Sequence, residues 1–202
     1  MKSIYQISTF AEWVFNKCKG PRLTTSDIDF DIFKERIKTF GKTDHAEIER
    51  IMSSIENHII GAPREYIVDF VDDDKSVFEA SNLKIRGQAM RGRPDLVLRH
   101  RTKDYLIIVE RKTTRQRRPI NLEETARGNW LNIQAQLWCY SHLDRWRDAA
   151  GVTLVGEIWV HHERLLTRAI DPLVWFKTDP RHQDDCRALF RRYRDSLDCI
   201  EG

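Results

Sequence analysis

The first sixty residues carry apolar side chains at the spacing of amphipathic helices. This pattern predicts two short helices, over residues 8–19 and 26–40. A third helix is predicted to begin at Asp44, which forms a capping box with Glu47, and to end before Gly61. No second apolar core is needed for these segments, so the first two helices are expected to pack on the rest of the chain.

From residue 66 onward, short apolar segments bounded by turn residues replace the helical pattern. Strands are predicted over residues 66–71, 77–90 (as a hairpin), 95–99, 105–112, 152–161 and 165–170, with helices over 128–146 and 183–200. This order predicts an α/β fold with a central mixed β-sheet flanked by helices. We expect residues 1–43 to be a helical lead-in packed on one domain of residues 44–202, a size that buries a substantial core.

The charge is distributed unevenly along the chain. The whole sequence has 34 basic and 31 acidic residues, a net charge of +3 that indicates no particular partner. The segment from Arg86 to Arg118 holds eleven basic residues and three acidic ones, a net charge of +8. A surface that binds anions is therefore expected near this segment.

Two features that would indicate a membrane or a secreted protein are missing from the sequence. No apolar run approaches the roughly 20 residues of a membrane-spanning helix, and the N-terminus does not have the basic-then-apolar pattern of a signal peptide. The expectation is a cytoplasmic protein without membrane association.

The predicted strand over 105–112 is apolar at Ile107-Ile108-Val109 and then becomes charged at Glu110-Arg111-Lys112. Residues two apart on a strand share a face, so Glu110 and Lys112 lie on the same side. A turn near residues 102–103 would place Asp95 opposite residue 110 in an antiparallel pair. A solvated ion pair is the simpler explanation of the strand end alone, but two adjacent carboxylates repel unless a cation lies between them. Oxygen ligands of this kind suit Mg²⁺ or Mn²⁺.

These residues resemble the motif of the PD-(D/E)XK nuclease superfamily. Pro94-Asp95 followed by Glu110-Arg111-Lys112 matches its short pattern. Gln136 and Tyr140 form a QxxxY, which is similar to the third motif of the RecB-like exonuclease branch. The resemblance covers about residues 58–140 and implies a restriction-endonuclease-like core and metal-dependent hydrolysis of phosphodiesters. It implies a catalytic set of Asp95, Glu110, Lys112, Gln136 and Tyr140.

The resemblance also implies a metal site and leaves part of it open. Asp95 and Glu110 would be metal ligands, together with the main-chain carbonyl of Arg111. A histidine or carboxylate on an upstream helix often completes the site in this branch, and His58 is the first choice, with Glu56 and then Glu49 as alternatives. Some members hold an iron–sulfur cluster, but none is expected here, because the four cysteines Cys18, Cys139, Cys186 and Cys199 lack the required spacing.

A basic loop follows the strand that ends at Lys112. We expect it to contact phosphates, with Trp130 near a base, and the predicted nucleic-acid-binding residues are Arg91, Arg93, Arg115, Arg117, Arg118 and Trp130. The chain is thus predicted to be a Mg²⁺- or Mn²⁺-dependent deoxyribonuclease of RecB-like type, expected to act as an exonuclease in DNA repair or phage defence. The alternative is an inactive or adaptor-type nucleic-acid-binding subunit of a larger complex, and a protein partner or homo-oligomer fits either function.

Overall fold

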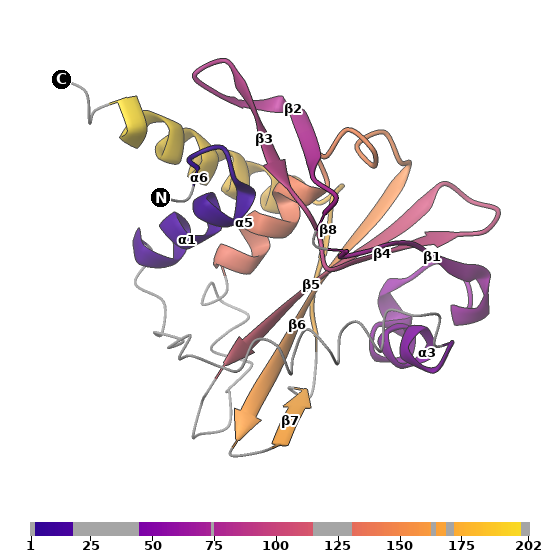
Figure 1. The fold of residues 1–202 in the computed structure, drawn as a ribbon. Helices are drawn as coiled ribbons and strands as arrows, with labels where there is room; N and C mark the ends of the chain where they lie inside the picture. Colours follow the sequence, from indigo (N-terminus) through magenta and orange to yellow (C-terminus); the bar gives the residue numbers. More distant parts are fainter. Residues whose placement is uncertain are drawn as a thin grey trace.

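A computed structural model gives the fold of the chain (Figure 1). The structure describes residues 3–17, 45–73, 75–114, 131–162, 165–168 and 172–198. The predicted helix over 26–40 and the basic loop after Thr114 lie outside these residues. No helix in the described part of the chain has both the length and the apolar character that crossing a membrane requires.

Within the described residues, a six-stranded mixed sheet forms the centre of the molecule, and the sequence predicted a central mixed sheet without this strand count. Its strands are β1 (Tyr66–Val71), β4 (Leu96–His100), β5 (Tyr105–Thr114), β6 (Gly151–His162), β7 (Leu165–Arg168) and β8 (Leu173–Phe176). The order is β1-β4-β5-β6-β7, and β8 also pairs with β6. Strands β5 and β6 are parallel, whereas the other pairs are antiparallel. The α/β class with a central mixed sheet is therefore confirmed.

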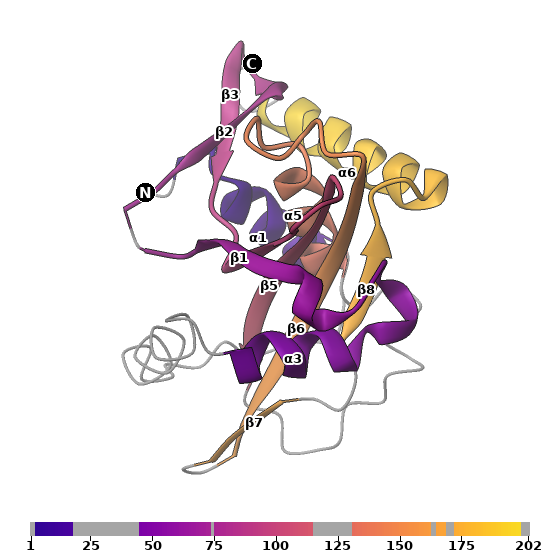
Figure 2. The same ribbon diagram turned by 90° about the vertical axis from the view of Figure 1, so that its right-hand side faces the viewer.

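Helices cover both faces of this sheet (Figures 1 and 2). Helices α1 (Ile7–Lys17), α5 (Leu131–Tyr140) and α6 (Pro180–Asp198) lie on one face, and α3 (His45–Ser54) lies on the other. The strands alternate their side chains between the two layers: Leu106 and Ile108 join the core with α1, α5 and α6, while Ile107 and Val109 join the core with α3. Strand β5 is thus buried on both faces, which explains its unbroken apolar run.

A separate hairpin is inserted between β1 and β4. It consists of β2 (Phe78–Ile85) and β3 (Gln88–Gly92), joined by a two-residue turn in which Arg86 and Gly87 both have positive φ, at 48° and 81°. The sequence predicted this hairpin over 77–90. Its strands pair with each other and form their own two-stranded sheet.

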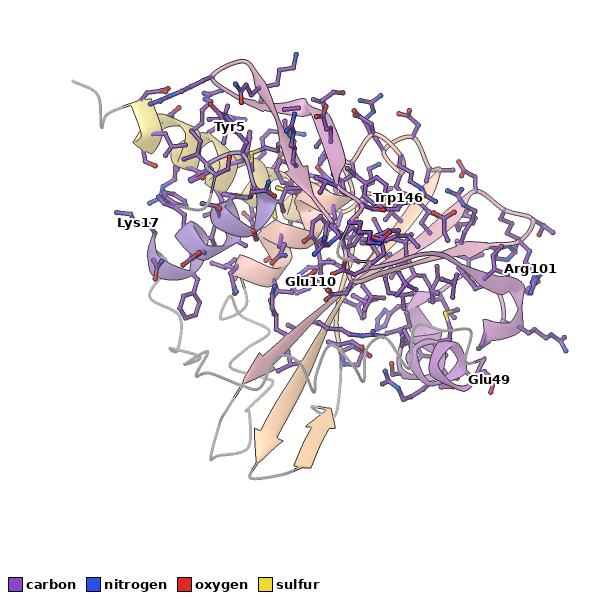
Figure 3. The ribbon with its side chains drawn as sticks, in the orientation of Figure 1. Tyr5, Lys17, Glu49, Arg101, Glu110 and Trp146 are labelled. Atoms are coloured by element: carbon purple, nitrogen blue, oxygen red, sulfur yellow. The ribbon has the colours of Figure 1, made fainter. Side chains whose placement is uncertain are left out.

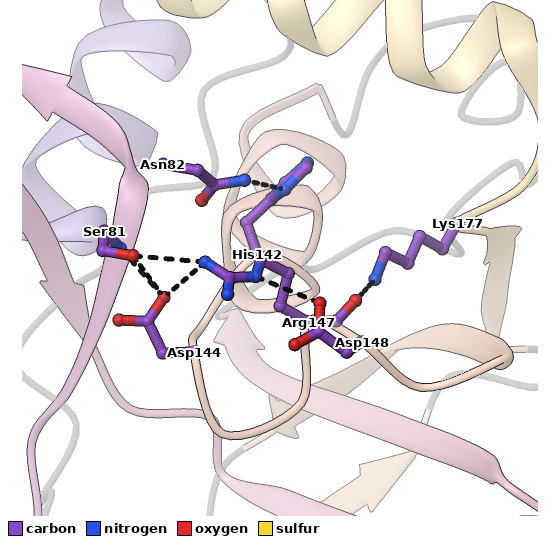
Figure 4. Close-up of polar contacts among 7 residues, drawn as sticks. All are labelled: Ser81, Asn82, His142, Asp144, Arg147, Asp148 and Lys177. Carbon is purple, nitrogen blue, oxygen red and sulfur yellow. Dashed lines mark hydrogen bonds and ion pairs between the residues drawn. The ribbon is translucent and has the colours of Figure 1, made fainter.

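Polar contacts hold the β2–β3 hairpin to the segment that follows α5 (Figure 4). Asp144 is central to them: its backbone N–H donates to the Glu79 carbonyl at 2.8 Å, and its Oδ1 accepts a bond from Ser81 Oγ at 2.7 Å. Arg147 Nη1 donates to the same two side chains, Ser81 Oγ at 3.2 Å and Asp144 Oδ1 at 3.0 Å. On the other strand, the Arg91 N–H donates to the carbonyl of Tyr5 at 2.8 Å. The hairpin is therefore fixed to the main body at both of its strands.

Three elements differ from the sequence predictions. Helix α3 ends at Ser54 and is followed by a 3₁₀ turn, η1 (Glu56–His58). The helix is therefore shorter than predicted, because the prediction extended it almost to Gly61. Helix α5 ends at Tyr140, and turns replace the predicted helix up to residue 146. Strand β8 was not predicted, because its four residues give too short a pattern to distinguish from a loop.

Helix α1 is part of the main core. Phe10 is fully buried, and its ring centroid lies 5.6 Å from that of Phe190 and 5.2 Å from that of Tyr193 on α6. Tyr193 also donates from its hydroxyl to the Ile4 carbonyl at 2.9 Å. The N-terminal segment is thus built into the layer that contains α5 and α6.

We expect the Phe10→Ala substitution to lower the free energy of unfolding by about 3–5 kcal/mol, because it removes a fully buried aromatic side chain and leaves a cavity. Chemical denaturation measures this loss. The exposed Asn16 on the same helix provides the control, and Asn16→Ala should change stability by no more than about 0.5 kcal/mol. Equal small effects in both variants would show that α1 is dispensable to the core.

Candidate active site

The register of the β4–β5 hairpin places two acidic residues next to each other. Leu96 pairs with Val109 at the end of the ladder, so the register continued by one residue brings Asp95 opposite Glu110. The sequence predicted this register from the position of the turn. Glu110 lies in the middle of β5, near the centre of the molecule (Figure 3), and Asp95 immediately precedes β4.

Glu110 is 3% exposed and makes its contacts through one oxygen. Its Oε1 accepts a hydrogen bond from Lys112 Nζ and another from Gln136 Nε2, the latter at 2.8 Å. Its Oε2 is buried and has no hydrogen-bond partner among the described residues. A buried carboxylate oxygen without a donor is costly to the fold, so this atom points to a ligand.

Helix α5 brings Gln136 and Tyr140 to this carboxylate. The two side chains lie one turn apart, and Gln136 Nε2 donates to the Tyr140 hydroxyl at 2.7 Å. Close packing of the helix makes this possible: a Cβ at Gly156, the β6 neighbour of Glu110, would lie 2.9 Å from a methyl group of Ile133. Gln136 is 3% exposed, so its side chain is a buried polar group directed at the site.

Asp95 is held from the main chain of β5. Its Oδ2 accepts a hydrogen bond from the backbone N–H of Arg111 at 2.5 Å. The Arg111 side chain extends to the opposite face of the sheet, where Nε lies 2.9 Å from Glu157 Oε2, and Arg50 Nη2 lies 3.2 Å from Glu157 Oε1. The carbonyl of Arg111 as a metal ligand stays a prediction from the resemblance.

The electrostatics of the site reflect two carboxylates that share one ammonium. Burial raises the pKa of Asp95. Burial, together with the charge of Asp95, raises the pKa of Glu110 to about 8. Burial alone would lower the pKa of Lys112, but the carboxylates of Glu110 and Asp95 outweigh it and the pKa of Lys112 is raised. The site therefore favours added positive charge.

The donor set fits a hard divalent cation. Two carboxylates with one orphaned oxygen are the ligands that Mg²⁺ and Mn²⁺ take, with water or substrate oxygens in the remaining positions. Among the residues that the structure describes, no group of three or more His, Cys, Asp or Glu side chains is positioned to hold a metal. Asp95 and Glu110 are the two carboxylates of this site, and each would offer an oxygen to the ion.

His58 does not lie with these residues. It belongs to η1, is exposed, and has its ring centroid 6.0 Å from that of Phe176. This turn follows α3, on the face of the sheet opposite Glu110, and Figure 3 shows Glu49 of α3 on that side. The alternatives Glu56 and Glu49 are also exposed there. The structure therefore does not bring His58, Glu56 or Glu49 to the two carboxylates, because α3 covers the other face.

Two of the predicted nucleic-acid-binding arginines are described, and both are ion-paired. Arg91 Nη2 lies 2.8 Å from Glu79 Oε1, and Arg93 Nε lies 2.5 Å from Asp72 Oδ1. Arg91 is the more exposed of the two, with 55% of its side chain accessible. The other predicted contacts, Arg115, Arg117, Arg118 and Trp130, lie outside the described residues.

Sequence reasoning missed two acidic residues around the site. Glu157 is fully buried, and its position as a single carboxylate in the apolar strand β6 was the available signal. Asp72 pairs with Arg93 and its charge contributes to the raised pKa values of Asp95 and Glu110, after burial as the main cause. The sequence Asp72-Asp73-Asp74 predicted only a turn, because Asp95, which lies next to Asp72 in space, is 23 residues away in the sequence.

Comparison with known proteins adds little. No family model matches this chain, and no curated protein matches it. Among solved structures, the one described as "Crystal structure of SSO0001" is similar to this chain with 17% sequence identity and a TM-score of 0.29, over 91% of this chain and 75% of that one. A likeness of this strength carries no argument about function.

The raised pKa of Glu110 predicts a pH-dependent effect of Glu110→Gln in chelator. The folded-state pKa of about 8 exceeds the unfolded value of about 4.3, so the wild-type protein loses stability as the pH rises between these values. The variant lacks this loss. We expect it to be more stable than the wild type at pH 8.5 and to show no gain near pH 4.5.

Denaturant midpoints across this pH range measure the effect. Glu79→Gln, which alters a carboxylate on an exposed ion pair, should show no such gain at high pH. A Glu110→Gln variant that is less stable than the wild type at pH 8.5 would contradict the assignment of charge repulsion to this site.

Proposed function

We propose that this protein is a Mg²⁺- or Mn²⁺-dependent nuclease that hydrolyses DNA phosphodiester bonds, of RecB-like type and acting as an exonuclease. The observation that carries the proposal is the buried pair of Asp95 and Glu110, with an orphaned oxygen on Glu110 and with Lys112 bonded to its other oxygen. The resemblance of these residues to the PD-(D/E)XK motif supports the same function.

The arrangement of charge suits phosphoryl transfer. A bound divalent cation would polarise a phosphoryl oxygen and lower the pKa of a bound water. The Lys112 ammonium lies beside both carboxylates and keeps about a third of its side chain exposed, at 34%. It is therefore able to orient a water molecule or to stabilise negative charge that develops on the phosphate.

Gln136 and Tyr140 support the same chemistry from α5. Gln136 Nε2 donates to both Glu110 Oε1 and the Tyr140 hydroxyl, so it fixes the carboxylate relative to the helix. Burial raises the pKa of Tyr140 well above its ordinary value, so its hydroxyl keeps its proton. We assign to these two residues the positioning of Glu110 and Lys112, since phosphoryl transfer depends on fixed geometry.

DNA as the substrate rests on the charge distribution. The segment from Arg86 to Arg118 has a net charge of +8 and includes both Asp95 and Glu110. Basic side chains near a phosphodiester-cleaving site supply binding that is independent of base sequence and sensitive to salt.

The proposal predicts that purified protein degrades linear DNA in Mg²⁺ or Mn²⁺ and leaves closed circular DNA intact, and that chelator abolishes this activity. Lys112→Ala should reduce the rate by about 100-fold or more, because it removes the only ammonium beside Glu110 and Asp95 in the described part of the chain. Gel assays with single- and double-stranded substrates measure the rates.

Lys84→Ala is the matched control, since Lys84 is an exposed lysine on the β2–β3 hairpin and should leave the rate unchanged. Cleavage of circular DNA would replace the exonuclease assignment with an endonuclease. Salt-sensitive DNA binding without cleavage in any metal would contradict the nuclease and favour the adaptor-type subunit.

A further inference from the structure

Three carboxylates lie in a row across neighbouring strands. Strand β1 pairs with β4 through Val71 and Leu96, so the next positions, Asp72 and Asp95, lie opposite each other. A hydrogen bond of 3.0 Å from the Asp72 N–H to the Asp95 carbonyl extends the pairing to these residues. Asp95 in turn lies opposite Glu110 on β5. The row therefore runs from β1 through β4 to β5.

The three side chains share the face that α5 covers. Their neighbours Val71, Leu96 and Val109 all pack in the core on the α3 side. Because successive side chains on a strand alternate between faces, Asp72, Asp95 and Glu110 are directed to the other side. Adjacent strands are about 4.8 Å apart, and like charges directly opposite each other are destabilising.

Two cationic side chains stand at the two ends of this row. Lys112 bonds to Glu110 at one end, and Arg93 Nε lies 2.5 Å from Asp72 Oδ1 at the other. The pair at the Asp72 end is partly shielded, with 27% of the Arg93 side chain and 23% of the Asp72 side chain exposed. The buried Glu110 Oε2 has no donor within the described ranges, and this is a separate indication of a ligand at the row.

We propose that Asp72 is a third carboxylate of the metal centre and that Arg93 competes with the metal ion for it. This inference rests on the metal-dependent function proposed above. In the structure Asp72 is paired with Arg93, and no three His, Cys, Asp or Glu side chains among the described residues converge on one point, so Asp72 becomes a ligand by turning from the guanidinium toward Asp95. A third carboxylate is expected to strengthen the hold on a divalent cation, because ligand charge sets the affinity of such sites.

If Arg93 competes with the metal ion for Asp72, substitutions of these two residues should change the Mn²⁺ affinity differently. Asp72→Asn should weaken Mn²⁺ binding by about 10-fold or more, since it removes a ligand. Arg93→Gln should leave Mn²⁺ binding as strong as in the wild type or make it stronger, since it removes the competing cation. Isothermal titration calorimetry with Mn²⁺ alone measures both, and thermal unfolding in chelator verifies that each variant is folded.

A double variant distinguishes two roles of Asp72, either as a direct metal ligand or as a nearby negative charge. Asp72→Asn combined with Arg93→Gln removes one negative and one positive charge, so the net charge near the site is unchanged. If Asp72 is a ligand, the double variant binds Mn²⁺ about as weakly as Asp72→Asn alone. Asp73→Asn is the matched control: Asp73 is exposed, caps the turn at Lys75 and Ser76, and should bind Mn²⁺ within about twofold of the wild type.

Three results would overturn the inference. A double variant with wild-type affinity would mean that Asp72 acts only through its charge, and an Arg93→Gln variant as weak as Asp72→Asn would make the ion pair structural. Failure of the wild type to bind Mn²⁺ would remove the metal centre, and the proposed function with it. If instead Mn²⁺ binds through Asp72 but no DNA is cleaved, the inference holds and only the nuclease function fails.

Discussion

Burial of Asp95 beside Glu110 is the constraint on which the site and much of its surroundings depend. Two carboxylates in neighbouring strands repel each other, and burial raises the pKa of both. Lys112 balances one charge. Gln136 of α5 donates a hydrogen bond to Glu110, as Lys112 does, and the backbone N–H of Arg111 donates one to Asp95. Each of these contacts favours the charged form that a metal ion would need.

A second group of buried charges lies on the opposite face of β5, where Glu157 is paired with Arg111 and Arg50. Alternation along the strand sends the Arg111 side chain away from Glu110 and Lys112, into a layer that is otherwise apolar. Glu157 lies in register with Arg111 on β6, is fully buried, and accepts contacts from both Arg111 and Arg50 of α3. A buried carboxylate is tolerated only when it is paired in this way. The pairing joins α3, β5 and β6 behind the candidate active site, so the strand that carries Glu110 is held from both sides.

The sequence was sufficient for the local parts of this arrangement. The apolar segments predicted β1, β4, β5 and β6, and the short turn near residues 102–103 predicted that Asp95 lies opposite Glu110, because a tight hairpin leaves few possible registers. The spacing of Gln136 and Tyr140 predicted that they share a helix face, and they are hydrogen-bonded. The position of His58 could not be predicted in the same way. Helical periodicity shows which side chains share a stripe, but not which face of the sheet the helix will cover.

The inserted hairpin explains both why Asp72 was missed and how the row of carboxylates is kept in place. Asp72 and Asp95 stand at its two ends, so their proximity depends on β1 and β4 meeting again after the chain has travelled through β2 and β3. No local sequence pattern contains that information. The hairpin is anchored by Asp144 after α5 (Figure 4) and also by the carbonyl of Tyr5 near the N-terminus. The segment after α5, the helix that carries Gln136, therefore also holds the insertion whose two ends are Asp72 and Asp95, so the packing of this segment connects Gln136 on one side of the row with the hairpin on the other.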